Sequence, residues 1–161
     1  MNTLLHNWKI YLDTCCLNRP FNDQTQTRIR RETEAIQTLL KYCFTEQWLW
    51  ITSDVLILEV NNTPNQIQRN YMNAQLDRAY QNVSVGAIEN TRGQELEAFG
   101  FKWFDALHLA CAESSKVDVF LTTDDRLIRR ANRIRALLQV RVKNPYIWLQ
   151  EEIRDERNRD D

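Results

Sequence analysis

The chain has 161 residues, of which 43% are hydrophobic and 27% are charged, as in an ordinary globular protein. This length predicts one domain that can bury a core without disulfides or a structural metal. The 21 Lys and Arg residues nearly balance the 22 Asp and Glu residues, which argues against a protein that coats nucleic acid non-specifically. No apolar run is long enough to span a membrane and no secretory signal is evident, so we expect a cytoplasmic protein.

Short apolar segments alternate with longer amphipathic segments along the chain. The expected strands cover residues 9–13, 48–52, 83–85, 118–122 and 138–142. The expected helices cover residues 26–46, a short stretch after Ser53, and residues 64–81, 87–99, 105–115, 124–136 and 145 onward. This alternation predicts an α/β fold in which the strands form a parallel sheet. We expect a single domain over residues 1–150, followed by a charged C-terminal tail over residues 151–161.

Four carboxylates stand where an apolar stretch stops or a helix begins: Asp13, Glu59, Asp105 and Asp124. The ends of parallel strands meet at one edge of their sheet, where ligands bind, so we expect these four side chains to lie together. Like charges at contact distance disfavour one another's ionised form, and a divalent cation is the simplest counter-charge. Oxygen ligands suit Mg²⁺ or Mn²⁺, which can activate water for hydrolysis of a phosphodiester.

Each of these acids also has a purely structural interpretation. Asp105 and Asp124 lie at expected helix starts, where Asp is among the best N-cap residues, and Asp13 could cap or turn the chain after its strand. Glu59 differs, because an ionised Glu in an apolar helix needs a partner or a position facing solvent. The four cysteines contain no C-x-x-C pair, so we do not expect a zinc site.

Four segments, in this order, resemble the acidic motifs of PIN-domain nucleases: YLDTCCLNRPF, SDVLILEV, FDALHLACAE and VFLTTDDRL. The resemblance extends from about residue 9 to residue 149 and is nearest to small stand-alone bacterial members, including toxin ribonucleases of the VapC type. It implies a three-layer α/β/α fold with a central parallel sheet of about four or five strands. It also implies that the four acids hold Mg²⁺ or Mn²⁺, that the protein cuts RNA to leave a 5′-phosphate, and that an antitoxin protein inhibits it.

Residues beside these acids are candidates for contacts with water, with the carboxylates or with substrate. Thr14, Thr122 and Thr123 could orient water or carboxylates, or could be ordinary threonines at strand ends. Asn18 and Arg19 follow the first acid closely enough to touch a phosphate, although Arg19 could equally form a surface ion pair.

The fourth acid has two alternatives, because Asp124 and Asp125 are adjacent. Aligning Thr122 with the threonine of the family's T-x-D motif selects Asp124, which we prefer, whereas aligning Thr123 selects Asp125. His108, one helical turn after the third acid, is interpreted as a histidine at the edge of the core. Clustered arginines are interpreted mostly as solvated helix faces. They are Arg28, Arg30 and Arg31, and Arg126, Arg129, Arg130, Arg133 and Arg135.

The leading hypothesis is a metal-dependent endoribonuclease that acts as the toxin of a toxin–antitoxin pair. The main alternative is a non-catalytic PIN-fold module that binds nucleic acid or protein. A weaker one is a phospho-acceptor domain, since Lys143, Asn144 and Pro145 follow an expected strand. The near-zero net charge is unusual for an enzyme that holds RNA by phosphate contacts. We therefore also expect a homodimer, in which a second subunit completes a groove for RNA.

Overall fold

The computed structural model describes residues 7–45 and 47–159. Within these residues, five strands form one parallel sheet in the order β3-β2-β1-β4-β5. The strands are β1 (Lys9–Leu12), β2 (Leu49–Ser53), β3 (Gln81–Val83), β4 (Val119–Leu121) and β5 (Arg141–Lys143). The expected α/β fold with a central parallel sheet is confirmed, and the carboxyl ends of all five strands share one edge.

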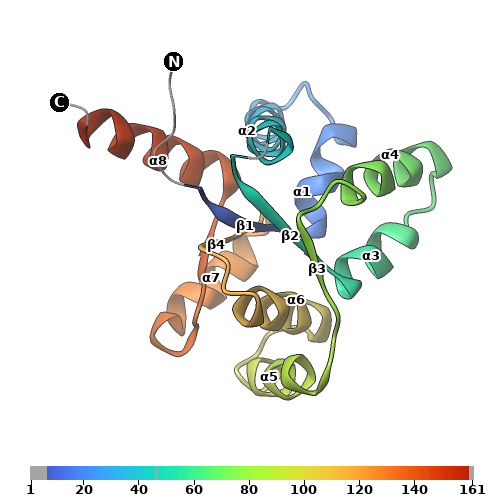
Figure 1. Cartoon of the computed structure of the whole chain (residues 1–161), viewed down its shortest axis with the longest axis vertical. Helices are drawn as coiled ribbons and strands as arrows, with labels where there is room; N and C mark the ends of the chain where they lie inside the picture. The colour runs from blue at the N-terminus through green and yellow to red at the C-terminus, as the bar shows by residue number, and fades with distance from the viewer. Residues whose placement is uncertain (1–6, 46, 160–161) are drawn as a thin grey trace.

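Helices cover both faces of the sheet and produce the expected three layers (Figure 1). On one face lie α1 (Thr14–Asn18), α2 (Thr27–Phe44) and α8 (Pro145–Arg159), with the 3-10 turn η1 (Arg19–Phe21) before α2. On the other face lie α5 (Ala87–Ala98), α6 (Trp103–Ser114) and α7 (Asp125–Arg133), and the turn η2 (Arg135–Leu137) follows α7. α3 (Asp54–Asn61) and α4 (Gln66–Leu76) connect β2 to β3.

The alternation of side chains along the strands divides the core into two apolar clusters. In β1, Ile10 and Leu12 belong to the cluster on the α2 and α8 side, whereas Tyr11 belongs to the cluster on the α5 and α6 side. Trp148 of α8 is fully buried and packs edge-to-face on Trp8, with ring centroids 5.3 Å apart. Since burying one large apolar side chain contributes about 1.5–3 kcal/mol, the two clusters hold the sheet and its helices in fixed positions.

Two differences from the sequence-based expectations affect the site. The segment after Asp13, where no helix was expected before residue 26, forms α1, because the Asp13 side chain accepts a hydrogen bond from the Thr14 N–H and caps the helix. α6 begins at Trp103, so its N-cap is Lys102, and Asp105 lies inside the first turn. The N-cap interpretation of Asp105 is therefore wrong.

Other boundaries shift by a few residues. β3 lies at residues 81–83 instead of 83–85. β5 lies at 141–143 instead of 138–142, because residues 138–140 bend between η2 and the strand. Asn65 caps α4 by accepting a hydrogen bond from the Gln68 N–H, so the helix begins after the expected Pro64. α8 continues to Arg159, through most of the expected tail, while residues 160–161 lie outside the described residues. No described helix is long and apolar enough to cross a membrane.

Candidate active site

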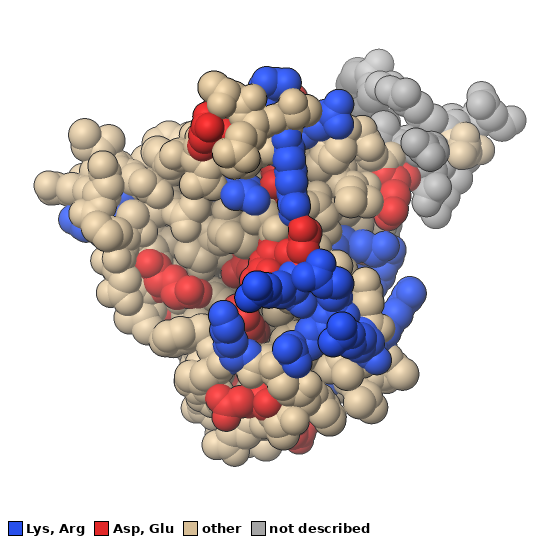
Figure 2. All heavy atoms as spheres, turned by 180° about the vertical axis from the view of Figure 1, so that it is seen from behind, with Lys and Arg blue, Asp and Glu red and all other residues tan. Residues whose placement is uncertain are grey.

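The carboxyl edge of the sheet gathers acidic residues that are far apart in the chain. Asp13 follows β1, Asp124 follows β4, Glu59 lies on α3 just beyond β2, and Asp105 lies in the first turn of α6. Figure 2 shows acidic side chains beside a dense group of basic ones on one face of the molecule.

Asp13 is held rigidly by hydrogen bonds to both of its carboxylate oxygens. Oδ1 accepts from the Thr14 N–H at 2.8 Å, and Oδ2 accepts from the Thr122 hydroxyl at 2.8 Å. The Thr122 oxygen in turn accepts from the Asp124 N–H at 3.1 Å, so one buried hydroxyl links the first acid to the loop of the fourth. The Asp13 side chain is only 11% exposed, which means that most of its surroundings are fixed protein atoms.

Glu59 is positioned by two partners from other elements. Its Oε1 accepts a hydrogen bond from the Thr14 hydroxyl at 3.1 Å and a second one from Nε2 of His108. His108 is 1% exposed, and its Nε2 also lies 3.9 Å from Asp13 Oδ1. Because this nitrogen faces two carboxylates, it carries a proton and donates to Glu59.

The other ring nitrogen of His108 joins a buried chain of hydroxyl groups. Nδ1 lies 2.6 Å from the Tyr11 hydroxyl, which lies 2.6 Å from Ser53 Oγ. Ser53 caps α3 by accepting from the Leu56 N–H at 3.1 Å, so the network that orients His108 also begins the helix that carries Glu59. The sequence interpretation of His108 as a core-edge histidine missed this contact with a candidate metal ligand.

The charges of this cluster shift the pKa values of its members. Burial lowers the pKa of His108, but its hydrogen bond to Glu59 and the nearby charges of Asp13 and Asp105 outweigh burial, so the pKa is raised. Burial raises the pKa of Glu59, yet its hydrogen bond to His108, the charge of that imidazole and the Thr14 hydrogen bond outweigh burial, so the pKa is lowered. These opposite shifts favour an ionised Glu59 beside a protonated His108.

The surroundings of Asp105 disfavour its ionised form. Burial and the negative charges of Asp13, Asp124 and Glu59 raise its pKa to about 6, against a smaller opposing effect of His108. Among the described residues, no hydrogen bond or ion pair to its carboxylate compensates for this crowding. A nearby cation would therefore stabilise the ionised form of Asp105 more than that of the other acids.

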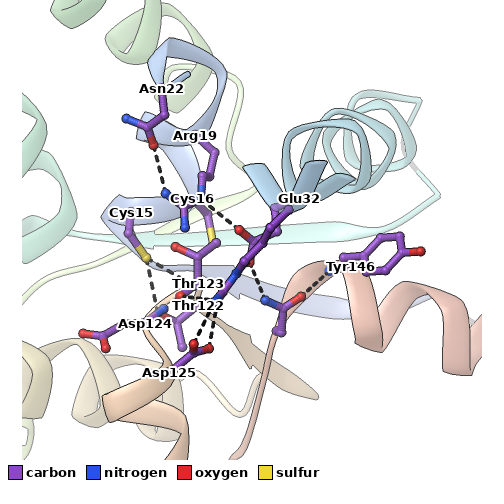
Figure 3. Close-up of polar contacts among 12 residues, drawn as sticks. Cys15, Cys16, Arg19, Asn22, Glu32, Thr122, Thr123, Asp124, Asp125 and Tyr146 are labelled. Atoms are coloured by element: carbon purple, nitrogen blue, oxygen red, sulfur yellow. Dashed lines mark hydrogen bonds and ion pairs between the residues drawn. The ribbon is translucent and has the colours of Figure 1, made fainter. Parts of the chain in front are cut away.

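Asp124 and Asp125 have different surroundings. Asp124 caps α7 by accepting from the Arg126 N–H at 2.9 Å, and its charge acts on Asp105. Asp125 forms a bidentate ion pair with Arg28, at 2.7 and 2.8 Å. Figure 3 shows the Asp124 carboxylate pointing away from Asp125 and its ion pair. Asp124 stays the predicted fourth acid, with Asp125 as the alternative.

The remaining sequence candidates lie beside the acids but make internal contacts. Arg19 donates from Nε to Glu32 at 3.0 Å, and Asn18 accepts from Gln68 at 3.0 Å. The Thr123 carbonyl accepts from Arg28 at 3.1 Å. Thr14 and Thr122 contact the candidate acids through their side chains, whereas the contacts of Thr123 within the described residues involve its backbone N–H and carbonyl.

The donor set fits a hard divalent cation. Among the described residues, no group of three or more Asp, Glu, His or Cys side chains is arranged so that it could hold a metal ion by itself. Mg²⁺ does not need one, because it keeps several waters and is held by one or two carboxylates together with substrate phosphates. Burial and the charges of the neighbouring carboxylates raise the pKa of Asp105, and a cation bound to these oxygens would offset that repulsion.

Comparisons with known proteins identify the family and the fold of the chain. No curated protein shows significant sequence similarity to the chain. Its fold is similar to that in a crystal structure of VapBC2 from Rickettsia felis bound to a DNA fragment from their promoter. That match has a TM-score of 0.58 and 14% sequence identity, and it covers 84% of this chain and 98% of the other. The family model described as PIN domain matches residues 10–133, a range that contains all four acids. The chain therefore belongs to the PIN-domain family, whose members are generally nucleases that use divalent metals.

Proposed function

We propose that the protein is a Mg²⁺- or Mn²⁺-dependent endoribonuclease in which Asp13, Glu59, Asp105 and Asp124 hold the metal. The observation that carries this proposal is the gathering of acids at one edge of the sheet, where Asp13 and Glu59 both approach Nε2 of His108. Burial and the charges of Asp13, Asp124 and Glu59 together raise the pKa of Asp105 beside them. A cluster of this kind is costly in the folded protein unless a cation compensates for it. Membership of the PIN-domain family supports the same chemistry.

The protein residues have separate tasks in this mechanism. The two hydrogen-bonded oxygens of Asp13 and the His108-bound carboxylate of Glu59 provide fixed positions for ligands. Asp105 has no such restraint and can turn toward the ion or take up a proton. When bound, the metal would lower the pKa of a water and neutralise charge that develops on the phosphoryl group. The Thr122 hydroxyl bonds both Asp13 and the backbone N–H of Asp124, and so fixes the position of Asp13 relative to the loop that carries Asp124.

Cleavage of labelled single-stranded RNA tests the proposal. We expect the wild-type protein to cut this RNA with Mn²⁺ and to stop when EDTA is added, and we expect Asp13→Asn to be inactive. Asp54→Asn is the control, because Asp54 is an exposed acid in the first turn of α3 that bonds Asn82 and lies outside the cluster. Equal activity of the Asp13→Asn and wild-type proteins would reject the assignment. RNA binding without any metal-dependent cleavage would favour the non-catalytic binding module.

We further propose that the enzyme acts in the cytoplasm as the toxin of a toxin–antitoxin pair. The fold similarity to VapBC2 supports this, together with the sequence resemblance to VapC-type toxins. Expression of the wild-type chain in a bacterial host should arrest growth, and expression of Asp13→Asn should not. An antitoxin should restore growth and co-purify with the chain, and size-exclusion chromatography of the free chain tests the expected homodimer. Growth that is equally poor with Asp13→Asn would contradict toxicity through cleavage.

A further inference from the structure

An open hollow of about 540 Å³ adjoins the acid cluster on the side of α7. Four arginines from three elements line it: Arg19 of η1, Arg28 of α2, and Arg126 and Arg129 of α7. Asp124 lines the same hollow, so the hollow is continuous with the candidate metal site.

The positive charge of the hollow exceeds its negative charge. Arg28 neutralises Asp125 through the bidentate ion pair, and Arg19 pairs with Glu32. Arg126 and Arg129 have no carboxylate within 4.0 Å in the described part of the chain. Since positions three apart on a helix share a face, α7 presents both of these guanidinium groups to the hollow.

A buried carboxylate holds one wall of the hollow in place. Glu32 is 2% exposed, and it accepts hydrogen bonds from Arg19 at 3.0 Å, from Arg28 at 3.4 Å and from Asn144 at 2.5 Å. Asn144 also accepts a hydrogen bond from the N–H of Tyr146, a residue at the start of α8 that packs against the core, so this wall is tied to the core. A preformed wall lowers the ordering cost of binding.

We propose that this hollow binds a backbone phosphate of the RNA that flanks the phosphate being cut, an inference that rests on the proposed nuclease function. Guanidinium groups match phosphate oxygens in geometry and form strong charge-assisted hydrogen bonds with them. Phosphate contacts set the position of a nucleic acid on a protein, so the hollow places the strand across Asp124 and the other acids. It also explains how a chain of net charge −1 holds RNA, because positive charge is concentrated beside the site.

Two matched double variants of one helix provide the test. Arg126→Gln/Arg129→Gln removes two charges from the hollow, and Arg130→Gln/Arg133→Gln removes two exposed charges from the same helix outside it. Binding of a fluorescent single-stranded RNA is measured by anisotropy in EDTA over a range of KCl concentrations. Each lost phosphate contact reduces the slope of log K against log salt by about 0.7 for a single strand. Because the two arginines hold one phosphate, we expect a reduction of about 0.7 for the hollow variant and no measurable reduction for the control.

Neutral methylphosphonates, introduced at one phosphate at a time, locate the contact. For the wild-type protein, we expect one internal position near the cut to weaken binding most. The hollow variant should be insensitive at that position, and the control variant should keep the full effect. A 5′-phosphorylated copy of the RNA distinguishes a terminal phosphate from an internal one.

The outcomes separate the phosphate site from the nuclease function. Equal slope changes in the two variants, or no position-specific methylphosphonate effect, would overturn the phosphate site even while the wild-type protein cuts the same RNA with Mn²⁺. Dependence on the 5′-phosphate alone would overturn the internal position. Wild-type protein that neither binds nor cuts RNA would overturn the nuclease function and the phosphate site together.

Discussion

Replacing Asp105 with Asn should stabilise the protein in the absence of metal while abolishing cleavage. The side chain lies in the first turn of α6, where its burial and the charges of Asp13, Asp124 and Glu59 raise its pKa to about 6. In the unfolded chain the same carboxyl has a pKa of about 3.9. The folded protein therefore binds this proton more tightly than the unfolded chain does.

The sign and size of the effect follow from this difference. Stability linked to Asp105 is fully present below about pH 4 and is lost as the pH rises through about 6, where the carboxyl ionises in the folded state. A difference of about two pKa units corresponds to about 3 kcal/mol, which solvent screening of this partly exposed side chain reduces to about 1–2 kcal/mol. The neutral Asn should recover that amount at pH 8, equivalent to about 2–8 °C in Tm for a chain of this size.

Thermal unfolding in EDTA, followed by circular dichroism between pH 4 and pH 8, measures the effect. We expect the Tm difference between Asp105→Asn and the wild type to be small at pH 4 and to grow through pH 6. Asp54→Asn controls for loss of an acid from a helix's first turn, and it should not increase stability. Mg²⁺ should raise the Tm of the wild type more than that of Asp105→Asn. An Asp105→Asn protein that is less stable than the wild type at pH 8 would refute the electrostatic reasoning.

Three further substitutions test the contacts around the acids. His108→Ala should lower metal affinity or cleavage by about 10- to 100-fold, since His108 orients Glu59. His108→Gln should restore part of the loss, because its side-chain amide offers an N–H to Glu59. An Mn²⁺ titration measures the affinity, and a wild-type affinity in His108→Ala would contradict this role. Thr122→Val should lower the free energy of unfolding, measured with urea, by about 1–3 kcal/mol, because Asp13 loses a buried hydrogen-bond donor. An unchanged urea midpoint would argue against this role of the Thr122 hydroxyl. Asp125→Asn should retain RNA cleavage and change the free energy of unfolding by less than about 1 kcal/mol, because it removes an exposed ion pair. Asp124→Asn should remain folded, since Asn also caps helices, but should be inactive in RNA cleavage. The reverse result would select Asp125 as the fourth acid.

Much of the fold could be predicted because strands and long helices have periodic patterns. Apolar runs such as the one that ends at Asp13 predicted the strand ends, and strand ends in a parallel sheet converge wherever the intervening chain goes. α1 was not predicted, because five residues are too few to show a helical period. The start of α6 was placed two residues too late, at Asp105, because Trp103 and Phe104, two aromatic residues, gave no sign that the helix had already begun.

The site depends on contacts that no local pattern contains. His108 reaches Glu59, which is 49 positions away, and Tyr11, which is 97 positions away, so its role depends on how three elements pack. The arginines of α7 were interpreted as a solvated helix face, and only the approach of η1 and α2 turns two of them into the wall of a hollow. The adjacent acids Asp124 and Asp125 differ because the first caps α7 and the second binds Arg28, a residue 97 positions away.

Anomalous scattering from a crystal soaked in Mn²⁺ tests the central claim most directly, because it locates the metal without relying on activity. We expect a single region of anomalous density at the carboxyl edge of the sheet, within coordination distance of carboxylate oxygens of Asp13 and Asp105, and its loss in the Asp13→Asn protein. Density elsewhere on the molecule, or none at this edge in an otherwise well-ordered wild-type crystal, would contradict it.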